Sequence, residues 1–175
     1  MIPLVLTYVG DDRPGLVGAV SEAIAAAGGT WLESRSARLA GKFAGILRVN
    51  IPDPSVPALE RALADLAPVG LTVTMERGEH EEPEAVSRVI TLDILGHERP
   101  GIVRDVALAL GELGVNIEEF ESGLESAAFT GVDMFRAHAR LSAPEALALE
   151  ELRRALEQLA GEIMVDLTIG DPAGR

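Results

Sequence analysis

The residues best suited to chemistry lie in two short stretches that repeat each other, GDDRPGLV (Gly10–Val17) and GHERPGIV (Gly96–Val103). In each, an arginine, a proline and a glycine come directly before an apolar helical pattern. Gly10 and Gly96 are expected to take a positive φ and to turn the chain sharply between a strand and a helix. Proline is favoured near the first helical turn, where unpaired N–H groups and the positive end of the helix dipole lie. Both stretches therefore predict loops that could hold a small anion such as a carboxylate.

The two stretches differ in how well they could cap their own helices. Asp11 or Asp12 could accept hydrogen bonds from the helix amides in the first copy, and capping could then be the only role of that loop. His97 and Glu98 occupy the equivalent positions of the second copy and are poorer caps. We therefore expect the second loop, beside Gly101, to be the better candidate for an occupied site.

The other residue types give little support to catalysis. Cysteine is absent, which excludes disulfides, thiolate catalysis and zinc sites of the cysteine type. The three histidines, His80, His97 and His138, are not at metal-ligand spacing. His138 alternates with Arg136 and Arg140 and is expected to face solvent with them. Phosphate-loop and nucleophile motifs are also absent, so we expect no catalytic residues, no metal site and no cofactor.

Composition and charge limit the partners. The formal net charge is −13 over 175 residues, and Lys42 is the only lysine. Direct binding to nucleic acid normally requires a basic surface, so it is not expected. The first twelve residues lack the basic region and cleavage site of a signal peptide, and no apolar run approaches the ~20 residues of a membrane helix. We expect a cytoplasmic protein.

The repeat extends well beyond the two loops, at an offset of 86 residues from Gly10 to Gly96. Near the ends the register slips, and Gly78 matches Gly170 at an offset of 92. Repetition over this length predicts two copies of one structural unit. The other matched pairs are Arg13 with Arg99, Val20 with Val106, Gly28 with Gly114, Glu33 with Glu119, Ser36 with Ser122, Phe43 with Phe129, and Gly45 with Gly131.

Each copy predicts the order strand, helix, strand, strand, helix, strand. In the first helix of each copy, Val17 and Val103 are expected on the buried face with the other apolar residues. Ser142 and Glu145 stand at the spacing of a capping box for the last helix. The strands predicted most clearly are Leu4–Gly10, Leu71–Arg77, Arg88–Gly96 and Ile163–Ile169, and Gly123–Gly131 is a candidate mobile loop.

This order predicts an α+β fold of two ferredoxin-like βαββαβ domains, each a four-stranded antiparallel sheet with two helices on one face. The stretch between the copies is acidic and contains glycine and proline, as is typical of a solvated linker. The predicted division is a first domain at 1–77, a linker at 78–86, a second domain at 87–170 and a tail at 171–175.

The repeated unit of strand, G-x-x-R-P-G-[LI]-V and helix resembles the ACT domain, a small regulatory module that binds amino acids. Two such units resemble the glycine cleavage system transcriptional repressor family over nearly the whole chain. The D-R-P-G signature also recurs in formyltetrahydrofolate deformylase, phosphoserine phosphatase and bacterial nitrogen sensors.

The resemblance implies that a small amino acid binds against the first loop and the start of the first helix. Arg13 and Arg99 could instead be packing or interface salt-bridge residues. The residues implicated are Asp12, Arg13, Gly15, Leu16 and Thr30 in the first copy, and His97, Glu98, Arg99, Gly101, Ile102 and Asn116 in the second.

The resemblance also implies a non-catalytic sensor that binds glycine or a similar amino acid and modulates a protein partner. That partner would be a transcription factor of glycine and one-carbon metabolism. Two alternatives stay open: an ACT dimerisation or interaction module without ligand, and a regulatory subunit of a separate amino-acid metabolic enzyme. A homodimer is expected, without direct contact to nucleic acid or membrane.

Overall fold

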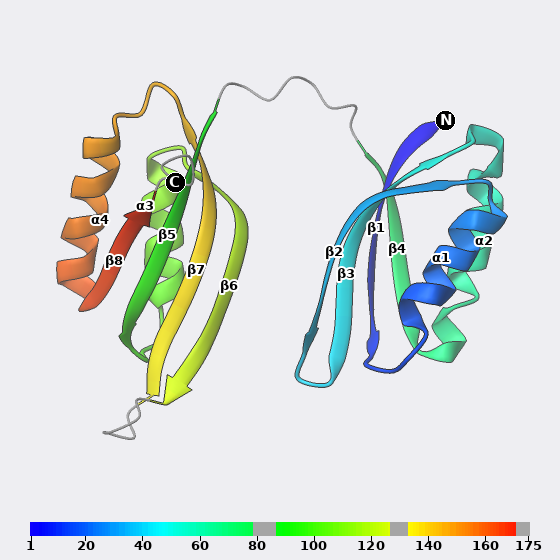
Figure 1. Ribbon diagram of the computed structural model, residues 1–175, viewed down its shortest axis with the longest axis horizontal. Coiled ribbons are helices and arrows are strands. Elements are labelled where there is room, and N and C mark those ends of the chain that lie inside the picture. Colours follow the sequence, from blue (N-terminus) through cyan, green and yellow to red (C-terminus); the bar gives the residue numbers. More distant parts are fainter. Residues whose placement is uncertain (79–86, 127–132, 171–175) are drawn as a thin grey trace. The chain divides into compact units, whose positions relative to one another are not determined.

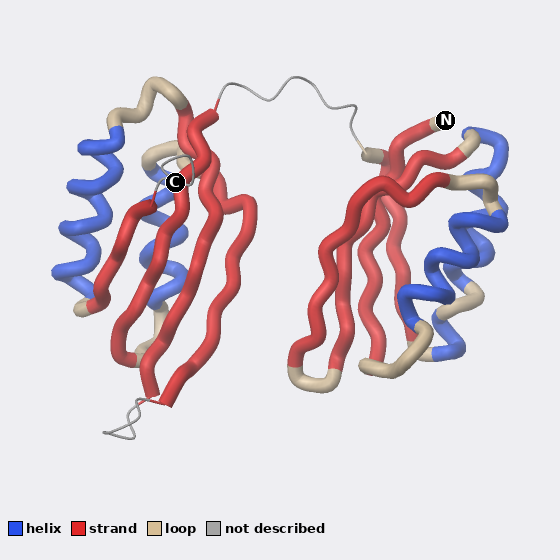
Figure 2. The backbone as a smooth tube through the Cα atoms, viewed as in Figure 1, coloured by secondary structure: helices blue, strands red, loops and turns tan. Residues whose placement is uncertain are grey.

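The computed structural model describes residues 1–78, 87–126 and 133–170. Contacts divide the chain into two compact units, Met1–Glu82 and Pro83–Arg175. Each unit consists of a four-stranded antiparallel sheet with two helices packed on one face, as Figures 1 and 2 show. The predicted pair of ferredoxin-like domains is confirmed. Apart from Gly78, the predicted linker lies outside the described residues, and so does the predicted tail.

The first unit has the strand order β2-β3-β1-β4, with all neighbouring strands antiparallel. Two short 3-10 turns, η1 (Asp53–Ser55) and η2 (Ala67–Val69), flank its second helix. The helices and strands are β1 (Ile2–Asp11), α1 (Leu16–Ala26), β2 (Thr30–Leu39), β3 (Lys42–Ile51), α2 (Val56–Ala64) and β4 (Leu71–Arg77).

The second unit repeats this topology, with the strand order β6-β7-β5-β8. None of the helices in the described part of the chain is long and apolar enough to cross a membrane. The elements are β5 (Ser87–His97), α3 (Ile102–Glu112), β6 (Asn116–Ser126), β7 (Asp133–Pro144), α4 (Leu149–Ile163) and β8 (Val165–Gly170).

Each unit buries its own core between the sheet and the two helices. Alternate residues of the central strands point toward the helices, which bury one face through residues at helical spacing. In α1 these are Leu16, Val20 and Ile24, and α3 repeats the pattern. Val17 and Val103 are each 44% exposed, so their predicted place on the buried face is wrong. The buried residues of each helix recur three or four positions apart, which leaves the second position of each helix outside the buried stripe.

The two cores differ at one cross-strand pair. In the first unit Tyr8 of β1 lies opposite Gly45 of β3, whereas in the second Ile94 lies opposite Ala137. A Cβ atom at position 45 would lie 2.5 Å from the Tyr8 hydroxyl, so glycine makes room for the larger ring. That hydroxyl is buried and finds no hydrogen-bond partner among the described residues.

The predicted capping box of the last helix is wrong. Ser142 lies within β7, which continues to Pro144 because it pairs with β5 along its whole length. Helix α4 begins only at Leu149, after the extended residue Ala148. It ends at Ile163, which was predicted to be in a strand. Ile163 continues the buried helical stripe, so β8 starts later than predicted.

Strand register also corrects the predicted repeat in the third strand. Phe43 lies opposite Gly10, and the residue opposite Gly96 is Phe135 rather than Phe129. The difference arises in the hairpin, where β2 and β3 join through a tight turn and the β6–β7 connection is longer. Strand β6 extends through Ser126, which includes the start of the predicted loop Gly123–Gly131. The rest of that loop lies outside the described residues.

Candidate functional site

The first RPG loop leaves β1 at Asp11 and enters α1 at Leu16. Gly15 is the helix N-cap, with φ 96° and ψ −5°, a left-handed conformation that favours glycine. The Ala19 N–H reaches the Gly15 carbonyl at 2.9 Å and forms the first intrahelical bond. The three amides before it, in residues 16–18, have no intrahelical acceptor. No side chain in the described part of the chain caps this helix.

The second RPG loop repeats this geometry closely. Gly101 is the N-cap of α3, with φ 97° and ψ −3°. The Asp105 N–H donates to the Gly101 carbonyl at 2.9 Å. Within the residues that the structure describes, α3 also lacks a side-chain cap. Both loops therefore present the unpaired amides of a helix N-terminus, which is a favourable place for an anion.

Gly10 and Gly96 do not turn the chain, contrary to the prediction from sequence. Both lie in strands with ordinary extended backbone, and the positive φ belongs to Gly15 and Gly101 instead. At Gly10 and Gly96, the absence of a side chain allows close packing against neighbouring residues. A Cβ on Gly10 would lie 2.5 Å from the Gly70 carbonyl oxygen, and one on Gly96 would clash with Val165.

Asp11 and Asp12 hold the first loop to the β2–β3 hairpin and do not cap α1. Asp11 pairs with Lys42, and its pKa is lowered, mainly by the hydrogen bond from that ammonium. Asp12 pairs with Arg38 at 2.8 Å, and its N–H donates to the Gly41 carbonyl at 2.9 Å. The predicted difference in capping between the two loops is therefore wrong.

The two arginines of the motif anchor their loops in the same way. Arg13 Nη2 donates to the Val69 carbonyl at 2.5 Å, and Arg99 Nε donates to the Ile163 carbonyl at 3.3 Å. Each of these carbonyls lies just ahead of the last strand of its unit. This arrangement supports the packing role of the two arginines.

A carboxylate in the first turn of α3 distinguishes the second loop. Asp105 accepts from Arg99 Nη2 at 3.0 Å and from Arg104 Nη2 at 2.8 Å. Hydrogen bonds from these two guanidinium groups lower the pKa of Asp105, and the bond from Arg104 has the larger effect. The first helix has Ala19 at the equivalent position. The second loop therefore has a cluster of one carboxylate and two guanidinium groups beside its helix N-terminus, which the first loop lacks.

The predicted ligand residues lie at different places around each loop. Leu16 and Ile102 are buried, at 4% and 2% exposure, so only their backbone groups could face a ligand. Glu98 is exposed and its N–H donates to the Asp133 carbonyl at 3.2 Å. His97 ends β5 and lines a hollow of about 500 Å³ formed with residues of β8 and the end of α4.

Thr30 and Asn116 do not join the loops of their own units. Thr30 opens β2 opposite Asn50, and Asn116 opens β6 opposite Ser142. These pairs lie at the end of the sheet away from the RPG loop, because β1 and β5 run from there toward it. An 11-residue helix such as α1 spans about 16 Å between the two ends.

The sequence did not reveal the partners of the loops. No sequence motif marks Arg38, Lys42 or the Val69 carbonyl. Only the fold of the sheet brings these groups to the first loop. Asp105 could have been noticed as an acidic residue in the first turn of a helix. In the described part of the chain, no group of three or more His, Asp or Glu side chains is placed to hold a metal ion.

Comparison with known families agrees with this geometry. Residues 3–76, which make up the first unit, match the ACT domain family. The chain belongs to the ACT domain family. It carries two ACT units, since the second unit repeats the fold and the loop geometry of the first.

Several known proteins are similar to this tandem ACT chain. An unknown protein from Galdieria sulphuraria is 32% identical, with a TM-score of 0.80, over 97% of this chain and 98% of that one. A protein assigned as a glycine cleavage system transcriptional repressor shares the fold, with a TM-score of 0.72 at 17% identity, over 97% of this chain and 96% of that one.

A curated relative is an enzyme. Phosphoserine phosphatase SerB2 of Mycobacterium tuberculosis is 29% identical over 178 aligned residues, which cover 97% of this chain and 41% of the phosphatase. The chain therefore spans less than half the length of this relative.

Proposed function

We propose that this tandem ACT protein is a regulatory protein that binds a small amino acid at its RPG loops and has no catalytic role of its own. The observation that carries the proposal is the repeated helix N-terminus, with a left-handed glycine cap and unpaired amides in both units. A free amino acid has a carboxylate for these amides. It also has an ammonium group for the carboxylates of the loop.

The first loop offers both partners within a short span. The amides of residues 16–18 would receive the ligand carboxylate, and Asp12 or Asp11 would lie near its ammonium group. Each charge-assisted bond contributes about 1.5–3 kcal/mol and the helix dipole about 0.3–1 kcal/mol, before ordering costs. An affinity in the micromolar to millimolar range follows, roughly 4–8 kcal/mol, which suits a metabolite sensor.

The second loop differs from the first in that Arg99 and Arg104 both pair with Asp105 beside the start of α3. His97, Glu98, Arg99, Gly101 and the Ile102 amide would surround a ligand there. Thr30 and Asn116 stay in the proposal only as contributions from a neighbouring copy, since each lies away from the loop of its own unit.

We propose glycine or a similar amino acid as the ligand and a transcription factor as the regulated partner. The shared fold with the protein assigned as a glycine cleavage repressor supports this choice. Direct action on DNA is disfavoured by the net charge of −13. Regulation requires that the ligand bind two states of the protein unequally, with a coupling of about 1–3 kcal/mol.

A second candidate function is favoured by the similarity to a phosphoserine phosphatase. In that case the two ACT units would regulate an amino-acid metabolic enzyme, and serine would be the more natural ligand. A panel that contains glycine, serine, alanine and the branched-chain amino acids distinguishes the two by the preferred ligand.

Calorimetric titration of the full chain tests the ligand site. Gly18 lies in the first turn of α1, is exposed, and has open space where a Cβ would stand. Gly18→Asp places a carboxylate over the amides of residues 16–18, whereas Gly18→Asn places a neutral side chain of the same shape there. We expect the heat of amino-acid binding at the first loop to be lost in G18D and kept in G18N.

Two results would contradict the proposal. No heat from the wild-type protein with any ligand of the panel at millimolar concentration would argue against an amino-acid sensor. Equal binding by G18D, G18N and wild type would show that the ligand carboxylate does not lie at the start of α1.

A further inference from the structure

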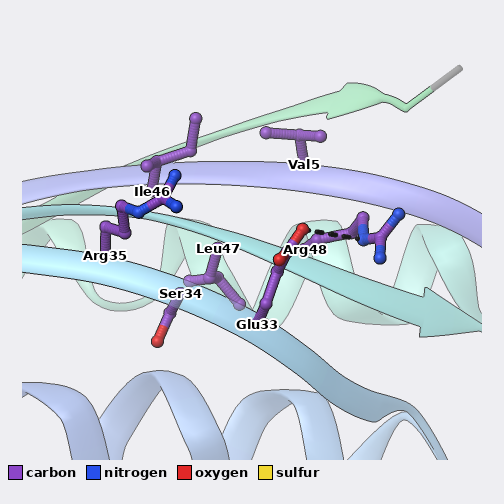
Figure 3. Close-up of a pocket in the computed structure, with 7 residues that line it drawn as sticks. All are labelled: Val5, Glu33, Ser34, Arg35, Ile46, Leu47 and Arg48. Atoms are coloured by element: carbon purple, nitrogen blue, oxygen red, sulfur yellow. Dashed lines mark ion pairs between the residues drawn. The ribbon is translucent and has the colours of Figure 1, made fainter. Parts of the chain in front are cut away.

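The two units differ strongly in charge. Residues 1–78 include eight acidic and seven basic side chains, so the first unit is nearly neutral. Figure 3 shows charges of both signs meeting there: Arg48 Nε lies 3.2 Å from Glu33 Oε1, and Arg35 lines the same shallow pocket. Residues 87–170 include fifteen acidic and seven basic side chains, a net charge of −8. The negative charge of the second unit should attract basic partners.

A groove lies between the two helices of the second unit. Helices α3 and α4 pack beside each other on one face of the sheet (Figure 1), and a hollow of about 500 Å³ lies between them. Each helix lines the hollow with residues at the i, i+3, i+4, i+7 spacing, which places them on one face of the helix. They are Asp105, Leu108, Ala109 and Glu112 in α3, and Ala155, Gln158, Leu159 and Glu162 in α4.

Small and apolar side chains form the middle of the groove. Ala109 and Ala155 end in a methyl group, so they leave space between the helices. Leu108 is 59% exposed, although contact with water is unfavourable for its side chain. The first unit has Glu22 at the equivalent position, so this fold does not require an apolar residue there. Leu108 is therefore available for contact with a partner.

Two carboxylates lie at opposite ends of the groove. Glu112 is the last residue of α3, and Glu162 lies one residue before the end of α4. The hydrogen bond from Arg99 Nε to the Ile163 carbonyl places the end of α4 beside the start of α3. Because the helices are antiparallel, the two ends of the groove each have one glutamate.

The charges of these two glutamates are not compensated. Neither Glu112 nor Glu162 forms an ion pair with the described residues, and Glu162 accepts a hydrogen bond from the neutral amide of Gln158 at 3.1 Å. Asp105, in contrast, pairs with two arginines. Among the described residues, no arginine lines the groove. The groove therefore combines an apolar middle with a free negative charge at each end.

We propose that the groove between α3 and α4 binds a basic amphipathic helix of a protein partner. Apolar residues of that helix lie over Ala109 and Ala155 and contact Leu108, while its lysine or arginine residues reach Glu112 and Glu162. The stretch from residue 105 to residue 112 spans about 11 Å, so two turns of the partner helix match the groove. The second unit of another copy has the same negative charge and would be repelled, which favours a partner of different sequence.

The groove is connected to the second RPG loop. Asp105 lines the groove and also accepts a hydrogen bond from Arg99 of the loop at 3.0 Å. Binding at the groove rests on the proposed regulatory role only in that a protein partner exists. Because peptide binding is measured without amino acid, its failure is distinct from a failure of the amino-acid titration.

Fluorescence anisotropy of a labelled peptide, titrated with the full chain, tests this site. The peptide has about 18 residues, long enough to form a helix, with leucine at the i, i+3, i+4, i+7 spacing and lysine at the other positions. A control peptide has glutamate in place of every lysine. We expect micromolar binding of the lysine peptide that weakens as salt is added, and no binding of the glutamate peptide.

A matched pair of leucine variants locates the contact. Leu108 and Leu124 are both 59% exposed, but Leu124 lies in β6 and does not line the groove. We expect the dissociation constant of the lysine peptide to rise at least about tenfold in Leu108→Lys and to stay unchanged in Leu124→Lys. Circular dichroism checks the fold of both variants.

Neutral variants of the glutamates keep the test valid if L108K does not fold. Glu112→Gln and Glu162→Gln each remove one charge at an end of the groove, whereas Glu157→Gln removes one from an exposed position of α4 outside it. We expect each of the first two to weaken binding about two- to fivefold and to reduce its salt dependence, and E157Q to have no effect.

Three results would overturn the proposal. The first is no binding of the lysine peptide, as when a second copy of the chain covers the groove. The second is equal binding of the lysine and glutamate peptides. The third is an equal loss of binding in the groove variants and in their controls, which would show attraction to the acidic surface as a whole.

Discussion

Replacing Gly15 with alanine tests the conformation that shapes the first RPG loop. Gly15 has φ 96°, and a Cβ there would meet nothing within 4 Å. The cost of alanine is therefore in the backbone alone, about 1–2 kcal/mol for an L-residue in the left-handed region. Gly18→Ala is the control in the same helix. Position 18 has ordinary helical backbone and open space, so alanine there should stabilise by up to about 1 kcal/mol.

The two substitutions should therefore move the unfolding of the first unit in opposite directions, by about 2 kcal/mol between them. For a domain of this size, 1 kcal/mol corresponds to a shift of about 4–8 °C, so the midpoints of G15A and G18A should differ by roughly 8–16 °C. Thermal unfolding followed by circular dichroism or calorimetry measures this difference. If G15A unfolds at or above the wild-type midpoint while G18A is stabilised, Gly15 does not hold this conformation and the geometry inferred for the loop is wrong.

Other substitutions test the packing and electrostatics of the two units. Tyr8→Phe removes a buried hydroxyl that has no hydrogen-bond partner among the described residues, so urea unfolding should show unchanged or slightly raised stability, by up to about 1 kcal/mol; a clear loss would mean that the hydroxyl has a partner. Gly96→Ala drives a methyl group into Val165 and should destabilise the second unit by about 1–3 kcal/mol, seen as a lower urea midpoint. The pKa of Asp105 is lowered, so its stabilising effect is complete above the unfolded value of about 3.9 and is lost as the pH falls through the lower folded value. Asp105→Asn should therefore be less stable than wild type at neutral pH, and the gap between their urea midpoints should close in acid; a gap that is the same at both pH values would refute this.

The order of elements could be predicted from the sequence because its signals are local. Apolar periodicity and glycine positions predicted every strand and helix, and the bounds of β4, Leu71–Arg77, agree with the structure. Errors occurred where local signals conflicted with pairing. Ser142 looks like a helix cap but belongs to β7, because its backbone groups pair with neighbouring strands. Ile163 looks like a strand residue but completes the buried stripe of α4.

The loops were predictable in their position and not in their contacts. The motif indicated a helix N-terminus that begins at a glycine, and both loops have one. It did not indicate which glycine takes the positive φ. Gly10 and Gly96 are needed for another reason, because a side chain at either position would clash with residues far along the chain. The same is true of Arg13, which bonds to the Val69 carbonyl.

By itself, the sequence determined that this protein has two copies of one unit, each with a strand, an RPG loop and a helix in a known order. Hydrophobic periodicity and glycine positions act over a few residues, so they can be recognised without the fold. Only the tertiary structure decided that Asp11 and Asp12 pair with the hairpin and that Asp105 pairs with Arg99 and Arg104 near the start of α3. These features depend on strand register, which sets residues from distant parts of the chain side by side.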